Sequence, residues 1–146
     1  MSIQSEDKLQ SFIEKLLSLG YRVAEVSKKP QIYSINGVLV NIRVRSKFKR
    51  ANGNRVFWYS VTFSVLKKVS WVIYITTTHD YFFMLPSSFL ESLKDRTYPD
   101  RKNDNVGVFD IDWDDSSIFL KQGERIPIIS YDLIDPKYCP ILSGLP

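Results

Sequence analysis

The sequence predicts an α+β fold in which a mixed, mainly antiparallel central sheet is flanked by helices. The chain of 146 residues is 44% hydrophobic and 25% charged, which is ordinary for one folded domain. Aromatic residues make up 14% of the chain, and such residues favour the half-buried surfaces of strands. Apolar residues recur at helical spacing in two segments, whereas strand-like alternation and short apolar runs recur along the rest of the chain.

The first predicted elements are a helix at 5–19 and a strand at 21–26. Ser5 can cap the helix, and acidic residues in the first turn suit the positive end of the helix dipole. A short strand at 31–35 and a long strand at 38–50 follow, with a turn signal between them. This order predicts that a helix precedes a set of antiparallel strands.

A second turn signal, Asn52-Gly53, predicts a hairpin with a two-residue loop. Such a loop fixes the register, and it places Arg50 opposite Arg55 and Val44 opposite Val61. The apolar face is expected in the core and carries Val40, Ile42, Val44, Ser46 and Phe48 against Phe57, Tyr59, Val61, Phe63 and Val65. The opposite face carries Asn41, Arg43, Arg45, Lys47 and Lys49 against Val56, Trp58, Ser60, Thr62 and Ser64.

The remaining predicted elements are strands at 71–75, 81–85, 106–112, 117–121 and 126–130, with a helix at 88–95 and a mobile loop at 94–105. One domain over residues 1–146 is expected. Within it, residues 1–95 form a helix–strand–hairpin–strand core, residues 96–131 add C-terminal strands, and residues 132–146 form a tail.

The basic hairpin face is the main functional feature of the sequence. Arg43, Arg45, Lys47 and Lys49 alternate along one strand, about 6.6 Å apart. The net charge is +4, and no acidic residue occurs between Glu25 and Asp80. A phosphate backbone is the natural partner of such a row. Further residues that would extend the positive field or stack on a base are Arg50, Arg55, Lys67, Lys68 and Trp58. The alternative is a solvated sheet face whose lysines discourage edge pairing.

The segment from Pro30 to Ser46 resembles the core of the PD-(D/E)XK nucleases, notably the Holliday-junction resolvases. In that family, Pro-Asp opens one strand and Asp/Glu-x-Lys closes the next. The preceding helix and strand, and the later strand at 71–75, are in the order of the family. The resemblance covers roughly the first 95 residues of the chain. It implies a restriction-endonuclease-like fold.

The catalytic motif of that family is degenerate in this sequence. Gln31 occupies the position of the aspartate, Arg43 that of the second acid and Arg45 that of the lysine. The carboxylates of the family hold a divalent cation that activates water, and Gln and Arg cannot do so. The resemblance therefore implies a nuclease fold whose former active site binds anions.

Few other residues of the sequence are candidates for catalysis or metal binding. Asp110, Asp112 and Asp114 alternate in a predicted strand and are weak candidates for a hard cation. The alternative is a strand end that runs into a turn. His79 and Cys139 are each the single residue of their kind, which argues against a zinc site or a nucleophilic centre.

The leading interpretation is a protein that binds nucleic acid without cleaving it, with DNA preferred to RNA and no cofactor. The first alternative is a Mg²⁺-dependent nuclease with a relocated site that draws on Glu14, Glu25 or the aspartates at 110–115. The second is a structural or interaction subunit without nucleic-acid contact, and a homodimer is left open. A single cysteine, a polar N-terminus and the lack of a long apolar run predict a cytoplasmic protein with no membrane partner.

Overall fold

The structure is a computed structural model that describes residues 3–100, 103–121 and 123–133. The predicted tail beyond residue 133 and Cys139 lie outside the described residues. The helices are α1 (Ile3–Ser18), α2 (Phe63–Leu66) and α3 (Ser87–Ser92), with a short 3-10 turn at Lys94–Arg96. The strands are β1 (Val23–Ser27), β2 (Ile32–Ile35), β3 (Val38–Arg45), β4 (Lys49–Ala51), β5 (Asn54–Thr62), β6 (Trp71–Thr76), β7 (Tyr81–Pro86), β8 (Tyr98–Asp100), β9 (Asn103–Asp112), β10 (Ser117–Phe119), β11 (Arg125–Pro127) and β12 (Ser130–Asp132).

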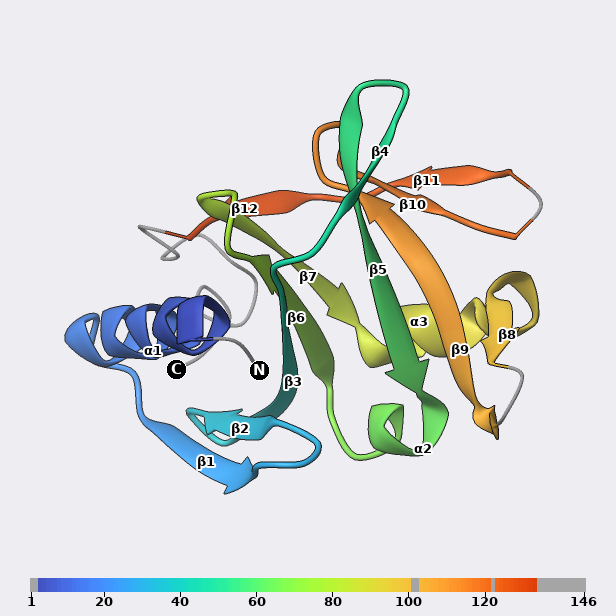
Figure 1. Ribbon diagram of the computed structural model, residues 1–146. Coiled ribbons are helices and arrows are strands. Elements are labelled where there is room, and N and C mark those ends of the chain that lie inside the picture. The colour runs from blue at the N-terminus through green and yellow to red at the C-terminus, as the bar shows by residue number, and fades with distance from the viewer. Residues whose placement is uncertain (1–2, 101–102, 122, 134–146) are drawn as a thin grey trace.

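In the described ranges, these strands form two sheets (Figure 1). The first sheet has the order β1-β2-β3-β6-β7-β12, and the second has the order β11-β10-β9-β5-β4, with β8 added on β9. Only β3 and β6 pair in parallel among the described strands. The α+β class and the mixed, mainly antiparallel pairing are confirmed, although the strands divide between two sheets.

The predicted long strand at 38–50 is wrong, because the chain changes sheet within it. β3 ends at Arg45, and β4 begins at Lys49 in the second sheet. β6 pairs with one edge of β3 along Val40–Arg45, and β2 pairs with the other edge along Val38–Asn41. No continuous edge of β3 is left for β5, which pairs instead with β9 along Val56–Thr62.

The tip of the hairpin is as predicted. Asn52 and Gly53 both have positive φ angles, 53° and 83°, and Arg50 lies opposite Arg55. This loop conformation follows from Asn-Gly, since Gly and Asn tolerate the left-handed region better than other residues. Only the short β4 pairs with β5, so the predicted pairing of Val44 with Val61 is wrong.

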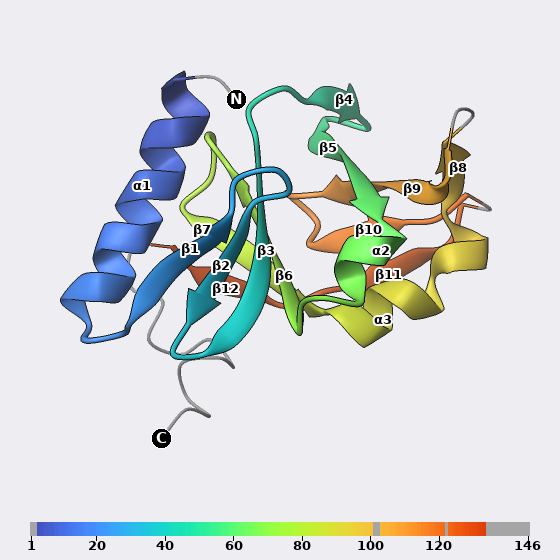
Figure 2. The ribbon, with the colours of Figure 1, turned by 90° about the horizontal axis from the view of Figure 1, so that it is seen from below.

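Most apolar residues of the predicted hairpin face are buried, but in two different cores. The prediction is wrong for Phe48, which is 41% exposed, and for Val56, which was expected on the opposite face and is buried. Val40 and Ile42 pack with α1 on one face of the first sheet. Phe57, Tyr59 and Val61 pack between the two sheets, together with side chains of α2 and α3. Seen from below, α1 covers one face of the first sheet while the second sheet covers the other (Figure 2).

In two segments the chain forms elements that the sequence pattern did not predict. The alternation that suggested a continuing strand after Thr62 ends in the short helix α2, which buries Phe63, Val65 and Leu66 in the core between the sheets. The segment 94–105, expected as a mobile loop, contains a 3-10 turn and β8, which pairs with β9.

Candidate nucleic-acid interface

Cationic side chains of β3 face β5 across the boundary between the two sheets. Arg43 donates from Nη2 to Ser60 Oγ at 3.2 Å. The guanidinium carbon of Arg45 lies 5.2 Å from the centre of the Trp58 ring. Side chains, rather than a backbone ladder, therefore connect β3 to β5. We call this surface the β3–β5 seam and define it as Asn41, Arg43, Arg45, Lys47, Trp58, Ser60 and Thr62.

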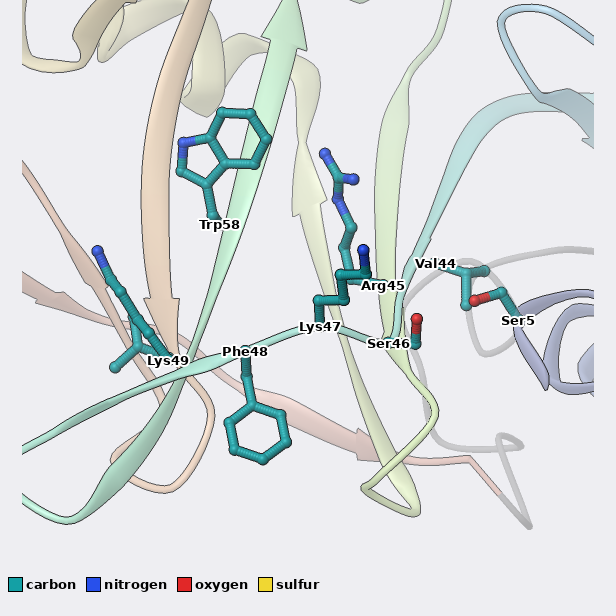
Figure 3. Close-up of a pocket in the computed structure, with 9 residues that line it drawn as sticks. Ser5, Val44, Arg45, Ser46, Lys47, Phe48, Lys49 and Trp58 are labelled. Atoms are coloured by element: carbon teal, nitrogen blue, oxygen red, sulfur yellow. The ribbon is translucent and has the colours of Figure 1, made fainter. Parts of the chain in front are cut away.

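At the hairpin end of the seam lies a groove of about 580 Å³, which we call the Trp58 groove. Its lining includes Arg45, Lys47, Lys49 and Trp58, together with Ser5 at the start of α1. The indole and the side chains of Arg45 and Lys47 extend to the same side of the connection that leads from β3 to β4 (Figure 3). Cationic and aromatic groups thus share one open surface, as the sequence predicted for the hairpin face.

Arg43 and Arg45 are both half-buried, and within the described residues neither has a carboxylate partner at ion-pair distance. Burial lowers the pKa of Arg45, and the neighbouring charge of Arg43 lowers this pKa further. An arginine stays protonated at neutral pH even so. Two positive charges are therefore held close together and partly out of water, an arrangement that a bound anion would relieve.

The other predicted cations are divided among separate places. Lys49 forms an ion pair with Asp110 at 3.1 Å, and Arg55 forms one with Asp114 at 3.0 Å. The lack of acidic residues between Glu25 and Asp80 does not leave Lys49 without a counter-charge, because β9 places Asp110 beside β5.

Three further cations lie away from the middle of the seam. Arg50 is exposed near the hairpin tip, where Nη1 donates to Gly53 O at 3.0 Å. Lys67 and Lys68 are exposed and follow α2, at the end of β5 opposite the hairpin (Figure 1). Arg43, Arg45 and Lys47 consequently form the centre of the predicted site.

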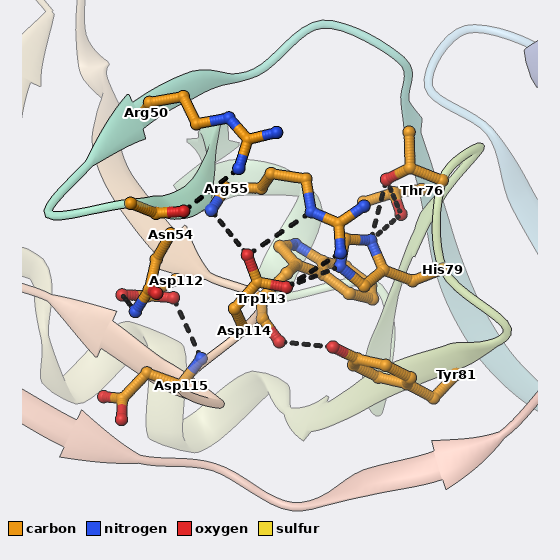
Figure 4. A network of polar contacts seen from close by, with 12 residues as sticks. Arg50, Asn54, Arg55, Thr76, His79, Tyr81, Asp112, Trp113, Asp114 and Asp115 are labelled. Carbon is orange, nitrogen blue, oxygen red and sulfur yellow. Dashed lines mark hydrogen bonds and ion pairs between the residues drawn. The ribbon is translucent and has the colours of Figure 1, made fainter.

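The aspartates at 110–114 do not converge on a common point. Asp112 is fully buried and accepts a hydrogen bond from Asn54 Nδ2 at 3.0 Å (Figure 4). Arg125 Nη1 lies 3.2 Å from the same carboxylate oxygen. Asp110 pairs with Lys49, and Asp114 pairs with Arg55. Within the described part of the chain, no group of three His, Cys, Asp or Glu residues could hold a metal ion. The turn interpretation accounts for these aspartates.

A polar network that reaches from the surface to the buried His79 joins the hairpin to the first sheet, and the sequence did not reveal it. Asp114 accepts hydrogen bonds from the backbone N of Arg55 at 2.6 Å and from Arg55 Nη2 at 3.0 Å (Figure 4). Asp114 Oδ1 also lies 3.1 Å from His79 Nε2, and His79 Nδ1 lies 2.7 Å from Thr78 Oγ1. His79 is a buried residue with partners on both ring nitrogens.

The charges in this network shift two pKa values. The hydrogen bond from the Arg55 side chain holds the pKa of Asp114 well below its usual range. Burial lowers the pKa of His79, and the hydrogen bond to Asp114 only partly opposes this effect. At neutral pH the network therefore consists of a carboxylate, a guanidinium and an uncharged imidazole. Such a set orients side chains and does not supply a nucleophile.

The residues aligned with the nuclease motif lie on opposite faces of the first sheet. Gln31 lines a shallow depression with Tyr33, Glu25 and Glu6, near α1. Arg43 is paired in register with Tyr74, whose side chain lies in the core between the sheets. The positions that the resemblance assigned to one catalytic centre are thus separated by the sheet.

The other acidic candidates of the nuclease alternative lie apart as well. Glu14 is an exposed residue of α1, and Glu25 is an exposed residue of the edge strand β1.

Within the described residues, no helix is both long and apolar enough to cross a membrane.

No protein-family model matches the chain, and no curated protein sequence matches it. Among solved structures, one similar chain is that of a bacterial homing endonuclease, with 15% sequence identity and a TM-score of 0.43. The similarity covers 62% of this chain and 71% of that chain. At this identity and TM-score, the likeness assigns neither a family nor an activity to the chain.

Proposed function

We propose that this protein binds nucleic acid, DNA in preference to RNA, through the β3–β5 seam and without cleaving it. The observation that carries the proposal is the pair of half-buried arginines, Arg43 and Arg45, which have no carboxylate partner among the described residues. Holding two like charges partly out of water lowers the stability of the free protein. A phosphate between them offsets that cost, because it supplies the missing negative charge.

Roles follow from the position of each cation. Arg43, Arg45 and Lys47 contact phosphates, and Ser60 orients the Arg43 guanidinium. Arg50, Lys67 and Lys68 extend the positive field toward the two ends of β5. Arg55 has a structural role, because both its backbone N and its side chain are engaged with Asp114. Lys49 contributes less than its neighbours, because Asp110 already neutralises it.

We further propose that the fold is restriction-endonuclease-like with a degenerate active site. Support comes from the order α1, β1, β2, β3 and from β6, which lies beside β3. In the resemblance to that family, Arg43 and Arg45 take the positions of an acid and a lysine, and paired guanidinium groups repel a divalent cation. Gln31, aligned with the other acid, lies on the opposite face of the sheet, so the motif is dispersed as well as altered. A cytoplasmic location, expected from the single cysteine, fits a protein that acts on DNA inside the cell.

The experiment is a binding assay with fluorescently labelled single-stranded, duplex and branched DNA at two salt concentrations. Arg43→Ala/Arg45→Ala is compared with Arg22→Ala/Lys121→Ala, which removes two exposed charges outside the seam. We expect the first variant to bind all substrates more weakly and the second to resemble the wild type. Equal binding by all three proteins contradicts the proposal. Light scattering that reports self-association unaffected by DNA would then favour the interaction subunit.

A further inference from the structure

The side chain of Trp58 is held outward by the register of β5. Its neighbours Phe57 and Tyr59 are fully buried between the sheets, so the alternation of the strand directs the indole away from the core. Pairing with β9, which places Trp58 opposite Asp110, fixes this orientation. The side chain is 52% exposed, although a tryptophan gains more than most residues from burial.

A cationic side chain, that of Arg45, lies beside the indole of Trp58 and can bind the charged part of a ligand that contacts the ring. Arg45 lies 5.2 Å from the ring centre, within the range of a cation–π contact, and this contact restricts the motion of both side chains. In the Trp58 groove, Lys47 extends to the same side as Arg45 (Figure 3). An apolar ring and two cations that have no carboxylate partner in the described part of the chain therefore share one surface. Such a combination suits a ligand that has both a flat ring and a phosphate.

Of the two aromatic residues among the described residues that line the groove, Trp58 alone presents its ring for stacking. Phe48 also lines the groove, but its side chain extends to the opposite side of the connection from the indole (Figure 3). Its ring packs on Phe57 at 5.5 Å, and Arg50 lies 5.5 Å from the ring centre on the hairpin. Phe48 therefore serves to anchor the hairpin, which leaves Trp58 as the ring available for stacking.

We infer that the Trp58 groove takes one unpaired base of a single strand, with the flanking phosphates on Arg45 and Lys47. The inference rests on the proposed function, and it names the substrate of the same surface. In an intact duplex both faces of every internal base are covered by neighbouring bases, so the indole has no ring to contact. In a single strand the face of a base is accessible, and the contact does not depend on the sequence.

The test measures the affinities of wild type, Trp58→Ala, Trp58→Phe and Ile129→Ala for a single strand and for a blunt duplex at one salt concentration. Ile129 is 69% exposed and lies outside the groove, so its variant controls for the loss of an exposed apolar side chain. We expect Trp58→Ala to weaken single-strand binding by about 5-fold to about 150-fold while duplex binding changes little. Trp58→Phe should retain part of the affinity, and Ile129→Ala all of it.

A fluorescence titration keeps the inference testable if Trp58→Ala fails to fold. Stacking on a base should quench part of the wild-type tryptophan emission, and this part should be missing in Trp58→Phe, which retains Trp71 and Trp113. Equal losses for both substrates in Trp58→Ala, or no loss, overturn the inference while the proposed function stands. If the wild type binds neither substrate, or if the seam arginines do not matter, the proposed function fails as well.

Discussion

Arg43 extends from β3 and donates to Ser60 of β5 at 3.2 Å, although the two strands share no backbone pairing. The hairpin register predicted from the sequence placed Thr62, not Ser60, opposite Arg43. The basic row and the hydroxyl row do lie together, as the sequence suggested. They meet through side chains, because the backbone of β5 is already paired with β9. This contact places half-buried cations at the boundary of two sheets.

Replacing the Asp114 carboxylate should destabilise the protein. Asp114→Asn loses the charge-assisted hydrogen bond from Arg55 and weakens the contact to His79. We expect the free energy of unfolding at neutral pH to fall by about 1–2 kcal/mol. Urea denaturation measures this change. Glu91→Gln, an exposed change on α3, is the control and should leave the unfolding midpoint unaltered.

Acidification should destabilise the protein in two stages. Because the folded pKa of His79 is below its unfolded value of 6.5, the unfolded chain binds more protons, and stability falls as the pH drops below about 6.5. Because the folded pKa of Asp114 is also depressed, its contribution is lost only as the pH drops further, below about 4. Urea denaturation across this range should show both stages.

The control for the first stage is His79→Gln, a variant that cannot be protonated in this range. Its free energy of unfolding should be flatter than that of wild type between about pH 7 and pH 5. Parallel curves for the two proteins would show that another group causes the loss of stability in this range.

The lysines after α2 should contribute less to binding than the seam arginines. Lys67→Ala/Lys68→Ala removes two exposed charges at the far end of β5, where they can extend the field but do not line the Trp58 groove. We expect a smaller loss of affinity than in Arg43→Ala/Arg45→Ala, in a titration at the same low salt. A larger loss would place the nucleic acid across α2 instead of along the seam.

The purified protein should not cleave DNA in the presence of Mg²⁺ or Mn²⁺. The aspartates Asp110, Asp112 and Asp114 are engaged separately by Lys49, Arg125 and Arg55. A nicking assay on supercoiled plasmid measures this. Metal-dependent cleavage that is lost in Asp112→Asn, in a variant shown to fold, would establish the nuclease alternative.

Local signals in the sequence predicted the local features of the fold. Asn52-Gly53 forms the hairpin tip because the turn depends on the backbone preferences of those two residues. The helix near the N-terminus and most strands were predicted by their own apolar patterns. The change of sheet after Arg45 was not predictable in this way, because it depends on β2 and β6 competing with β5 for the edges of β3.

The candidate site was predicted in part, for the same reason. Alternation alone placed Arg43, Arg45 and Trp58 on one surface. The partners of the other polar groups are distant in sequence: Asp114 lies 59 residues after Arg55, which it neutralises, and 35 residues after His79, to which it is hydrogen-bonded. Only the packing of β9 against β5 places these acids near the hairpin, and no pattern within a single strand encodes that.

The salt dependence of binding to single-stranded DNA tests the central claim most directly. Each phosphate contact on a single strand contributes about 0.7 to the slope of log affinity against log salt. Arg43→Ala/Arg45→Ala should therefore reduce this slope by about 1.4, while Arg22→Ala/Lys121→Ala keeps the wild-type slope. An unchanged slope and affinity in the folded Arg43→Ala/Arg45→Ala variant would contradict the account, because the seam would then be a solvated surface that does not contact nucleic acid.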